Sequence, residues 1–460
     1  MIVRLLSKKY RLFWMVIHVL LGIGSTFSNL FVIVWFYLIL LSCFYLVSFS
    51  RFSKPVILAG TMVYIGAFEL LARMTKCSPA IPWEASKYVF TLLTVSGLLI
   101  TLGKKRTNHL GWFILLLLIP SVFIDKSGVT DTGDIIFNIM GLVNIGLGIS
   151  FFSTLHLNKN RFIDMIRMMA YPCISILVFT IIKTPDLDEI GFSLGAQVAT
   201  SGDFGSNQVS TVLGFGFLLL TLSWLLVWKI SGSRITDGII ATIFLMQGLF
   251  TFSRGGMIGG GLALLVFMYY LYFQSSHKFS IPPSVKKYAI PSILIFIVAI
   301  IYTNNLTDGK LLLRYQGETQ GTVTGTRERD LTTITSNRNL IFLSDMELWS
   351  EFPVFGSGAG TSKYMRTEGR GLAAHVELSR LLAEHGILGI AIFMILLSLF
   401  FRLRKEKDPL IKAIKISLFI LALFTTFHSA TRTFITPLLL SVCVININTI
   451  KKNHVVISGK

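Results

Sequence analysis

Charged residues and cysteines are both scarce in this sequence. Only 14% of the residues are charged while 53% are hydrophobic, and the mean hydropathy is +0.70. These values lie outside the range of soluble globular proteins and inside that of proteins with many membrane spans. The four cysteines form neither a Cys-x-x-Cys pair nor a metal-binding pattern, which leaves them as small packing residues.

Motifs of nucleotide-driven and metal-dependent enzymes are also missing. The sequence has no Gly-x-x-x-x-Gly-Lys-Ser/Thr loop, no Rossmann glycine pattern and no His-Glu-x-x-His pair. These absences argue against ATP-driven chemistry. Asp186-Leu187-Asp188 is a formal Asp-x-Asp pair of the kind that holds a divalent cation in sugar-nucleotide enzymes. Because that pattern is very common, we expect neither a metal nor another cofactor.

Long apolar runs dominate the sequence. About 20 apolar residues in a helix cross a bilayer core, and many runs have that length. The sequence therefore predicts an all-α polytopic membrane protein with about 12–14 transmembrane helices and one large, partly helical external loop. The expected spans cover residues 12–27, 30–49, 55–72, 86–102, 109–124, 134–155, 162–183, 207–228, 236–252, 257–273, 288–303, 386–401, 411–427 and 434–450.

The distribution of positive charge sets the expected orientation. A net charge of +19 would suit a nucleic-acid partner in a soluble protein. Here the lysines and arginines concentrate in short loops on one side of the expected spans, as they do in cytoplasmic loops. We therefore expect both termini in the cytoplasm, membrane lipids as the surroundings and no nucleic-acid partner. A second apolar run directly follows the first, so we expect the first to be a retained span rather than a cleaved signal.

One long polar segment interrupts the apolar runs, and we expect it on the external side. It divides the chain into a first transmembrane part, the large loop and the C-terminal transmembrane helices, at 1–303, 304–385 and 386–460. Apolar residues at three- and four-residue spacing predict a loop helix over 337–350. A second helix is expected over 372–385, whereas the Thr- and Gly-rich stretch 306–336 is expected to be irregular.

Ser253-Arg254-Gly255-Gly256 places an arginine between two expected spans at the external interface. An arginine at that depth is costly and marks a functional site by default. The neighbouring glycines would let the phosphates of a ligand approach the backbone. The alternative is an arginine that extends to the membrane surface beside glycines that serve helix packing. The pattern alone leaves both interpretations open.

Two further candidates lie in the large loop. Arg338 stands at the start of the first expected loop helix, and its planar guanidinium suits a phosphate group. A surface ion pair is the alternative role. We place His375 in the second expected helix, where histidine suits proton transfer near neutral pH, and its alternative is helix capping or packing. Of the other external histidines, His385 precedes a glycine and indicates a helix end, and His428 falls in the last external turn.

Together these residues suggest one chemistry. Two arginines at an external membrane interface suit a lipid-linked diphosphate. A nearby histidine suits deprotonation of a hydroxyl that attacks the sugar carbon next to that diphosphate. The arginines would stabilise the charge that grows on the leaving diphosphate, so no metal would be required.

The order of these motifs resembles the O-antigen ligase and O-antigen polymerase superfamily. Asn207 lies in Gly202–Gln208, which is similar to a segment that the family carries before a span. The resemblance covers about residues 200–389, and beyond them only the topology is similar. It rests on Ser253-Arg254-Gly255-Gly256 after a span and, in the loop, on Asn337-Arg338, Trp349, Pro353, Gly356-x-Gly358-x-Gly360, His375 and Leu381-Leu382-Ala383-Glu384-x-Gly386-x-x-Gly389.

The resemblance implies a metal-independent glycosyltransferase of the C-type fold in the bacterial inner membrane, with its active site at the periplasmic face. The donor would be a glycan on undecaprenyl diphosphate. The acceptor would be lipid A-core for a ligase, or a second lipid-linked glycan for an O-antigen or exopolysaccharide polymerase. Arg254 and Arg338 match the family's diphosphate-binding arginines, and His375 matches its acceptor-activating histidine. The substrate-binding surface would also include Asn207, Lys87 and Arg432.

A transporter of a lipid-linked glycan is the alternative from another class. It would place charged residues deep within its spans and open to both faces in turn. Charges within the expected spans are few, since Glu69, Asp164 and Asp237 lie near span ends. The conspicuous polar residues gather on one face, which favours an enzyme. The choice between ligase and polymerase stays open.

Overall fold

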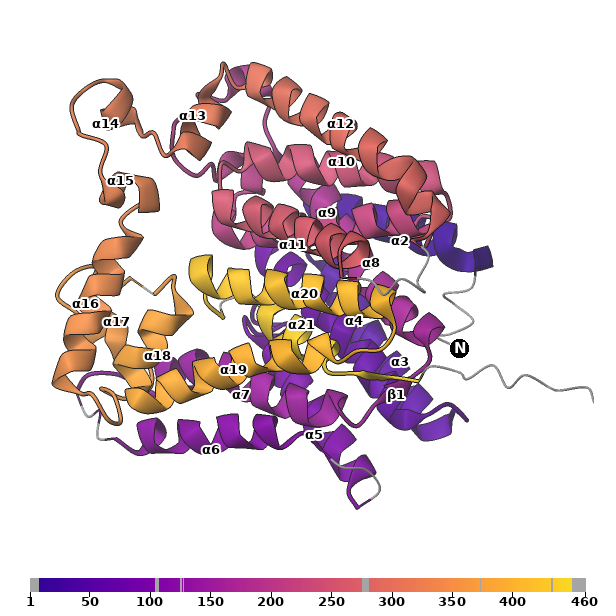
Figure 1. Ribbon diagram of the computed structural model, residues 1–460, viewed down its shortest axis with the longest axis horizontal. Helices are drawn as coiled ribbons and strands as arrows, with labels where there is room; N and C mark the ends of the chain where they lie inside the picture. The colour runs from indigo at the N-terminus through magenta and orange to yellow at the C-terminus, as the bar shows by residue number, and fades with distance from the viewer. Residues whose placement is uncertain are drawn as a thin grey trace, which may run out of the picture.

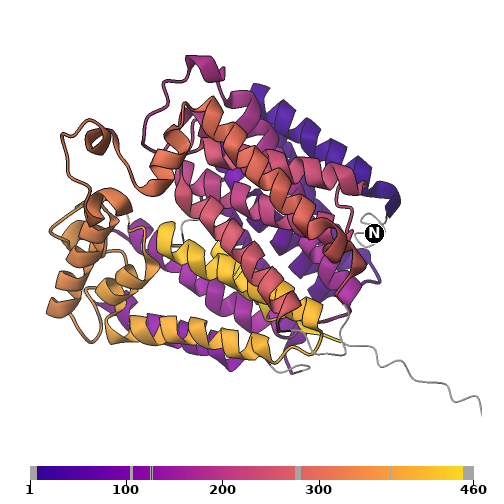
Figure 2. The same ribbon diagram turned by 45° about the horizontal axis from the view of Figure 1, so that its top comes forward.

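The computed structural model describes residues 8–103, 107–124, 126, 128–274, 281–372, 374–431 and 433–448. The protein is 74% helical, and its one sheet in the described ranges has two short strands. The long helices run side by side as a bundle. The short helices of the large loop gather at one end of that bundle, as two views agree (Figure 1, Figure 2).

A helix is present in each segment that we expected to cross the membrane. Nine helices in the described ranges are long and apolar enough to do so, and α2, α5 and α6 are apolar but shorter. The chain is therefore an all-α multi-pass membrane protein. The bundle helices are α2 (Arg11–Phe27), α3 (Leu30–Phe49), α4 (Lys54–Met74), α5 (Ala85–Thr101), α6 (His109–Phe123), α7 (Thr132–Phe152), α8 (Lys159–Lys183), α9 (Ser206–Leu226), α10 (Arg234–Phe250), α11 (Arg254–Tyr272), α12 (Pro283–Leu306), α19 (Ile387–Arg404), α20 (Pro409–His428) and α21 (Ile435–Cys443).

The last bundle helix is shorter than expected. We predicted a span over 434–450, but α21 ends at Cys443. After it the chain extends into β2 (Asn446–Ile447), which pairs in parallel with β1 (His156–Leu157). The Asn446 side chain also donates to the Ser153 carbonyl at 2.6 Å. These bonds to the β1 segment replace the helical ones, and the small sheet lies at the opposite end of the bundle from the large loop (Figure 1).

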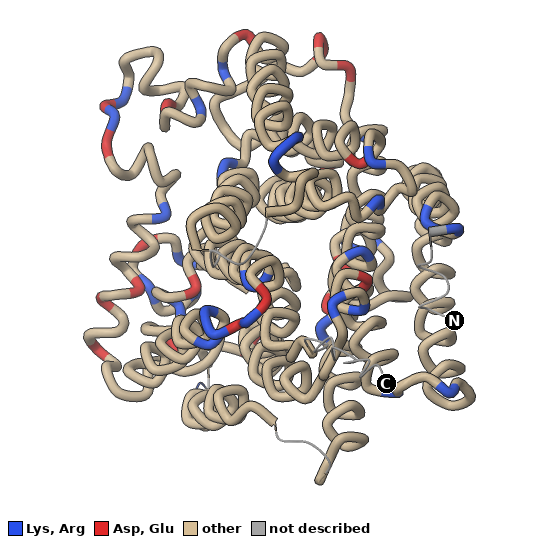
Figure 3. The backbone as a smooth tube through the Cα atoms, turned by 45° about the vertical axis from the view of Figure 1, so that its right-hand side comes forward, with Lys and Arg blue, Asp and Glu red and all other residues tan. Residues whose placement is uncertain are grey.

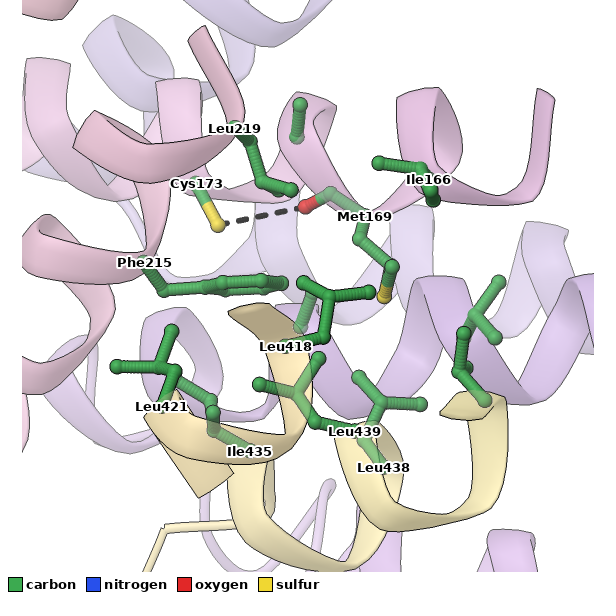
Figure 4. Packing of buried hydrophobic residues seen from close by; sticks show 14 of the residues in the cluster. Ile166, Met169, Cys173, Phe215, Leu219, Leu418, Leu421, Ile435, Leu438 and Leu439 are labelled. Carbon is green, nitrogen blue, oxygen red and sulfur yellow. Dashed lines mark hydrogen bonds between the residues drawn. The ribbon is translucent and has the colours of Figure 1, made fainter. Parts of the chain in front are cut away.

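The core is centred on α9, the most deeply buried of the candidate spans. It packs against α8, α10 and α11. Figure 4 shows part of this core, where apolar side chains of four helices interdigitate and the Cys173 thiol donates to the Met169 carbonyl at 3.3 Å. The labelled side chains come from α8 (Ile166, Met169, Cys173), α9 (Phe215, Leu219), α20 (Leu418, Leu421) and α21 (Ile435, Leu438, Leu439).

Glycines let α9 and α11 approach unusually closely. A Cβ atom on Gly256 would lie 2.1 Å from the Ser210 carbonyl carbon, and one on Gly214 would lie 2.1 Å from the Gly256 oxygen. At such distances any side chain would push the helices apart. The glycines after Arg254 therefore serve helix packing, which was the alternative interpretation, and they hold the starts of α9 and α11 together.

The large loop contains more helix than expected. Its helices are α13 (Lys310–Gln316), α14 (Gln320–Val323), α15 (Leu331–Thr335), α16 (Arg338–Glu351), α17 (Ser362–Met365) and α18 (Glu377–His385). Helix α16 confirms the first predicted loop helix. The prediction of an irregular 306–336 stretch was wrong, because Thr319 and Asp330 each form a reciprocal capping box that starts a short helix.

The second loop helix begins later than predicted. Val376 has extended backbone angles and Glu377 is the first residue of α18, so the expected start at residue 372 was wrong. His385 is the last residue of α18 and Gly386 follows with a φ of 59°, which confirms the expected helix end. Three 3-10 turns complete the described helices, at Lys8–Tyr10 (η1), Leu187–Glu189 (η2) and Ala199–Ser201 (η3).

Charge follows the expected pattern of a membrane protein. In Figure 3 most of the helical tube carries neither sign, and the Lys, Arg, Asp and Glu positions concentrate in connections and near helix ends. The large loop carries both signs. Some charged side chains are nevertheless buried within the bundle helices, among them Glu69, Arg73, Lys87, Asp237 and Lys415.

Candidate functional site

Three helices begin where the bundle meets the large loop. Asn207 lies in the first turn of α9, Arg254 is the first residue of α11 and Arg338 is the first residue of α16. The Asn207 side-chain oxygen accepts hydrogen bonds from the Ser253 hydroxyl at 2.7 Å and from an Arg338 Nη at 3.4 Å. Three residues that the sequence identified separately are thus brought together.

The starts of these helices are themselves electropositive. The N-cap residues of α9, α11 and α16 make no side-chain cap bond and none of the three first turns has an acidic residue, although in α16 the Asn339 N–H donates to the Thr335 hydroxyl at 3.4 Å. Unpaired backbone N–H groups and the helix dipole therefore add positive potential at the point where the arginines lie. An anion placed there would be stabilised by backbone and side chains together.

Arg254 connects the bundle to the loop through neutral oxygens. Its Nη2 donates to the Ile334 carbonyl at 2.5 Å and to the Ser336 hydroxyl at 3.4 Å. Its Nη1 donates to the Arg314 carbonyl at 3.3 Å. The half-buried side chain therefore reaches over to α13 and α15 instead of extending into the membrane surface, which was its alternative role.

A third arginine, Arg314 of α13, belongs to the same cluster and was missed from the sequence. Its side chain is buried, its Nε donates to the Phe252 carbonyl at 3.4 Å and its Nη2 to the Ser336 hydroxyl at 3.4 Å. Ser336 thus accepts from both Arg254 and Arg314. The only sequence signal was an arginine directly after three leucines in a stretch that we expected to be irregular.

The three guanidiniums, which we call the arginine cluster (Arg254, Arg314 and Arg338), have no anionic partner in the described part of the chain. No carboxylate there lies within 4.0 Å of any of them. Burial first, and then the charges of Arg254 and Arg338, lowers the pKa of Arg314 to about 10. Burial and Arg254 likewise lower the pKa of Arg338. Like charges in a partly dry site repel one another, so the cluster is poised for an anion.

Tyr315 adds a polar atom without a partner to this site. Its hydroxyl is buried and finds no hydrogen-bond partner among the described residues. Burial raises the pKa of Tyr315, while the adjacent charges of Arg254 and Arg314 lower it in part. A neutral phenol beside two guanidiniums offers one further donor to an anion bound there.

His375 lies two residues before α18 and not inside that helix, so its predicted position in a helix was wrong. Its carbonyl accepts a hydrogen bond from the Ala430 N–H at 3.1 Å, in the turn between α20 and α21. The Glu377 carboxylate also binds this turn, because it accepts a hydrogen bond from the Thr431 N–H at 3.1 Å. The backbone of the half-buried His375 is therefore held at the turn that follows His428.

His428 links that turn to the arginine cluster. Its Nε2 lies 3.0 Å from the Thr211 hydroxyl, which in turn donates to the Asn207 carbonyl at 2.6 Å. A Cβ on Gly255 would come within 2.4 Å of the His428 ring. Because only 3% of His428 is exposed, its ring is a packing contact between α9, α11 and α20.

Lys87 is neutralised in a buried ion-pair network. Its ammonium pairs with Glu84, and only 1% of the residue is exposed. Arg73 pairs with both Glu69 and Glu84, so the network holds two carboxylates and two cations. Because the carboxylate of Glu84 neutralises the ammonium of Lys87, Lys87 does not add the positive charge to the substrate surface that we predicted. The other predicted addition, Arg432, lies outside the described residues.

The glycine motif of the loop supports α18. Gly356, Gly358 and Gly360 all have positive φ angles, between 75° and 105°. The Ser357 N–H donates to the Ala383 carbonyl at 2.8 Å, and the Gly358 N–H to the Glu384 carbonyl at 3.2 Å. This backbone docking fixes the last turn of α18 and so orients the chain on which His375 lies.

Within the described ranges, no group of three or more His, Cys, Asp or Glu side chains is arranged to hold a metal ion. No protein-family model matches the chain, and no curated protein matches it significantly.

Proposed function

We propose that this membrane protein transfers a glycan from a polyprenyl-diphosphate donor to an acceptor hydroxyl at the external face of the inner membrane. The single observation that carries the proposal is the arginine cluster. The three guanidiniums have no carboxylate within 4.0 Å in the described structure, and two of them, Arg254 and Arg338, begin the helices α11 and α16, while Arg314 lies within α13. A diphosphate attached to a membrane lipid is the anion that fits this charge and this place.

The chemistry follows from that anion. The acceptor hydroxyl oxygen forms a bond to the anomeric carbon of the donor sugar, and the bond from that carbon to the diphosphate oxygen breaks. The diphosphate leaves with the bonding electrons, and Arg254, Arg314 and Arg338 stabilise its added charge. The acceptor proton passes to His375, which is the general base of the proposal.

The acceptor decides between two forms of the activity. Lipid A-core as acceptor makes the protein an O-antigen ligase, and a second lipid-linked glycan makes it an O-antigen or exopolysaccharide polymerase. The transporter alternative has less support. The buried charges of Glu69, Arg73 and Glu84 form ion pairs with one another, and the three guanidiniums without a carboxylate partner lie where the bundle meets the large loop.

The proposal is tested with purified protein, undecaprenyl-diphosphate-linked glycan and each acceptor in turn. Arg254→Ala, Arg338→Ala and His375→Ala are each expected to abolish transfer while the protein still elutes as a single folded species. Arg370→Ala is the matched control, because Arg370 is an exposed arginine of the same loop outside the cluster. Full transfer activity in Arg254→Ala or Arg338→Ala would refute the proposal.

A further inference from the structure

A pocket of about 370 Å³ adjoins the arginine cluster on its outer side. One wall is the external connection between α8 and α9, at Ser193–Gly195. The opposite wall is the loop segment that contains α13, α14 and α15. The volume falls within the range of small-molecule binding sites.

Most of the residues that line the pocket have polar side chains, and Leu194 and Gly195 complete the lining. Besides Arg314 and Arg327 it consists mainly of hydroxyl and amide side chains, and no acidic or aromatic residue is among the described residues that line it. Hydroxyls and amides both donate and accept, as the hydroxyl groups of a sugar ring do. The polar lining residues are Ser193, Thr319, Gln320, Thr332, Thr333, Ser336 and Asn337.

The pocket is continuous with the arginine cluster. Ser336 lines the pocket, and its hydroxyl accepts from Arg254 and from Arg314, each at 3.4 Å. Arg314 lines the pocket as well. A group bound in the pocket would therefore lie directly next to an anion bound at the cluster.

Hydrogen bonds and an ion pair hold the walls of the pocket in place. Two side chains that line the pocket take no part in these bonds. Arg329 closes the outer wall, since it donates to the Gln316 carbonyl at 2.5 Å and pairs with Glu318 at 3.3 Å. The Gln197 side chain holds the inner wall by donating to the Ser193 carbonyl at 3.0 Å. Gln320 and Arg327 are exposed, and neither side chain forms a hydrogen bond or ion pair with the described residues.

We propose that this pocket binds the first sugar units of the donor glycan, those attached directly to the diphosphate. The inference rests on the proposed function and adds a site for recognition of the donor sugar. Gln320 and Arg327 supply its free hydrogen-bonding groups, and Ser336 marks the boundary between the sugar and the diphosphate.

The test is a binding titration of the purified full-length protein in detergent with three probes. They are inorganic pyrophosphate, farnesyl diphosphate and farnesyl-diphospho-N-acetylglucosamine. In the wild type, the sugar-bearing probe is expected to bind about tenfold more tightly than farnesyl diphosphate, since one to two net hydrogen bonds are gained. The double variant Gln320→Ala/Arg327→Ala is expected to lose that advantage and to bind the other two probes unchanged. Arg370→Ala is expected to bind all three like the wild type.

The other possible results distinguish failure of the sugar site from failure of the proposed function. If the sugar adds no affinity in the wild type, or if the double variant keeps the full advantage, the sugar site is refuted. Binding of pyrophosphate in that same experiment would leave the diphosphate site, and with it the proposed function, intact. If none of the three probes binds to the wild type, the proposed function fails and the sugar site fails with it.

Discussion

Replacing Arg314 with glutamine is expected to stabilise the empty protein and to weaken anion binding. The pKa of Arg314 is lowered to about 10, mainly by burial and then by Arg254 and Arg338. One pKa unit corresponds to 1.36 kcal/mol, so keeping this group charged in the folded protein costs about 3 kcal/mol. Since the group is charged below about pH 10, the cost is present at neutral pH and is relieved only as the pH rises through 10.

The bonds of Arg314 return only part of that cost. Its two hydrogen bonds, to Phe252 and Ser336, are both 3.4 Å long and together contribute about 1 kcal/mol. Arg314→Gln should therefore stabilise the empty protein by about 1–2 kcal/mol and raise its Tm by about 2 °C. The same change removes a charge-assisted hydrogen bond of about 1.5–3 kcal/mol to a bound diphosphate. The Kd for pyrophosphate should rise about 10- to 100-fold.

Thermal unfolding in detergent, followed by intrinsic fluorescence at several pyrophosphate concentrations, measures both effects in one experiment. Pyrophosphate should raise the Tm of the wild type as the anion relieves the repulsion within the cluster. Arg370→Gln, in the exposed part of the loop, should change neither the Tm nor the response to pyrophosphate. A lower Tm for Arg314→Gln without anion, together with an unchanged Kd for pyrophosphate, would refute the reasoning.

Three further predictions concern the surroundings of the cluster. Lys87→Gln removes one of the two cations that pair with the buried Glu84, so it should destabilise the protein by about 3 kcal/mol in thermal unfolding. A titration should show an unchanged Kd for pyrophosphate. Burial raises the pKa of Asp345 to about 6, above its unfolded value of about 4, so stability should fall as the pH rises from 4 to 6. Asp345→Asn should remove that slope from a series of unfolding curves. His375→Gln should lose glycan transfer while it keeps the wild-type affinity for pyrophosphate, and loss of both would show that His375 supports the fold instead.

The bundle was predictable from the sequence because lipid imposes simple rules. A helix in lipid must satisfy its own backbone hydrogen bonds, so apolar length alone identifies it. The error at α21 has a local cause. Apolar residues continue to Ile445, but Asn446 pairs with the segment at His156 and extends the chain, which an apolar count does not register.

The arginine cluster was only partly predictable. Arg254 and Arg338 stand out by sequence context, at a span boundary and at a helix start. Arg314 does not, because its burial depends on Phe252 and Ser336, which are distant in sequence. A fold-dependent contact of this kind leaves no periodic signal.

Lys87 was predicted to belong to the substrate-binding surface but instead forms a buried ion pair. Its spacing of three residues from Glu84 was visible and is typical of a helical ion pair. The network became a closed, neutral unit only through Arg73 and Glu69 of another helix, α4. The expected position of Lys87 on the external side was therefore insufficient evidence for a role in substrate binding.

The most direct test of the central claim is glycan transfer by the purified protein, measured as release of undecaprenyl diphosphate together with formation of the glycosylated acceptor. The wild type and Arg370→Ala should release the lipid diphosphate in step with product, and the double variant Arg254→Ala/Arg338→Ala should release none. Transfer that persists in the double variant at the wild-type rate would contradict the claim that the arginine cluster binds the donor diphosphate.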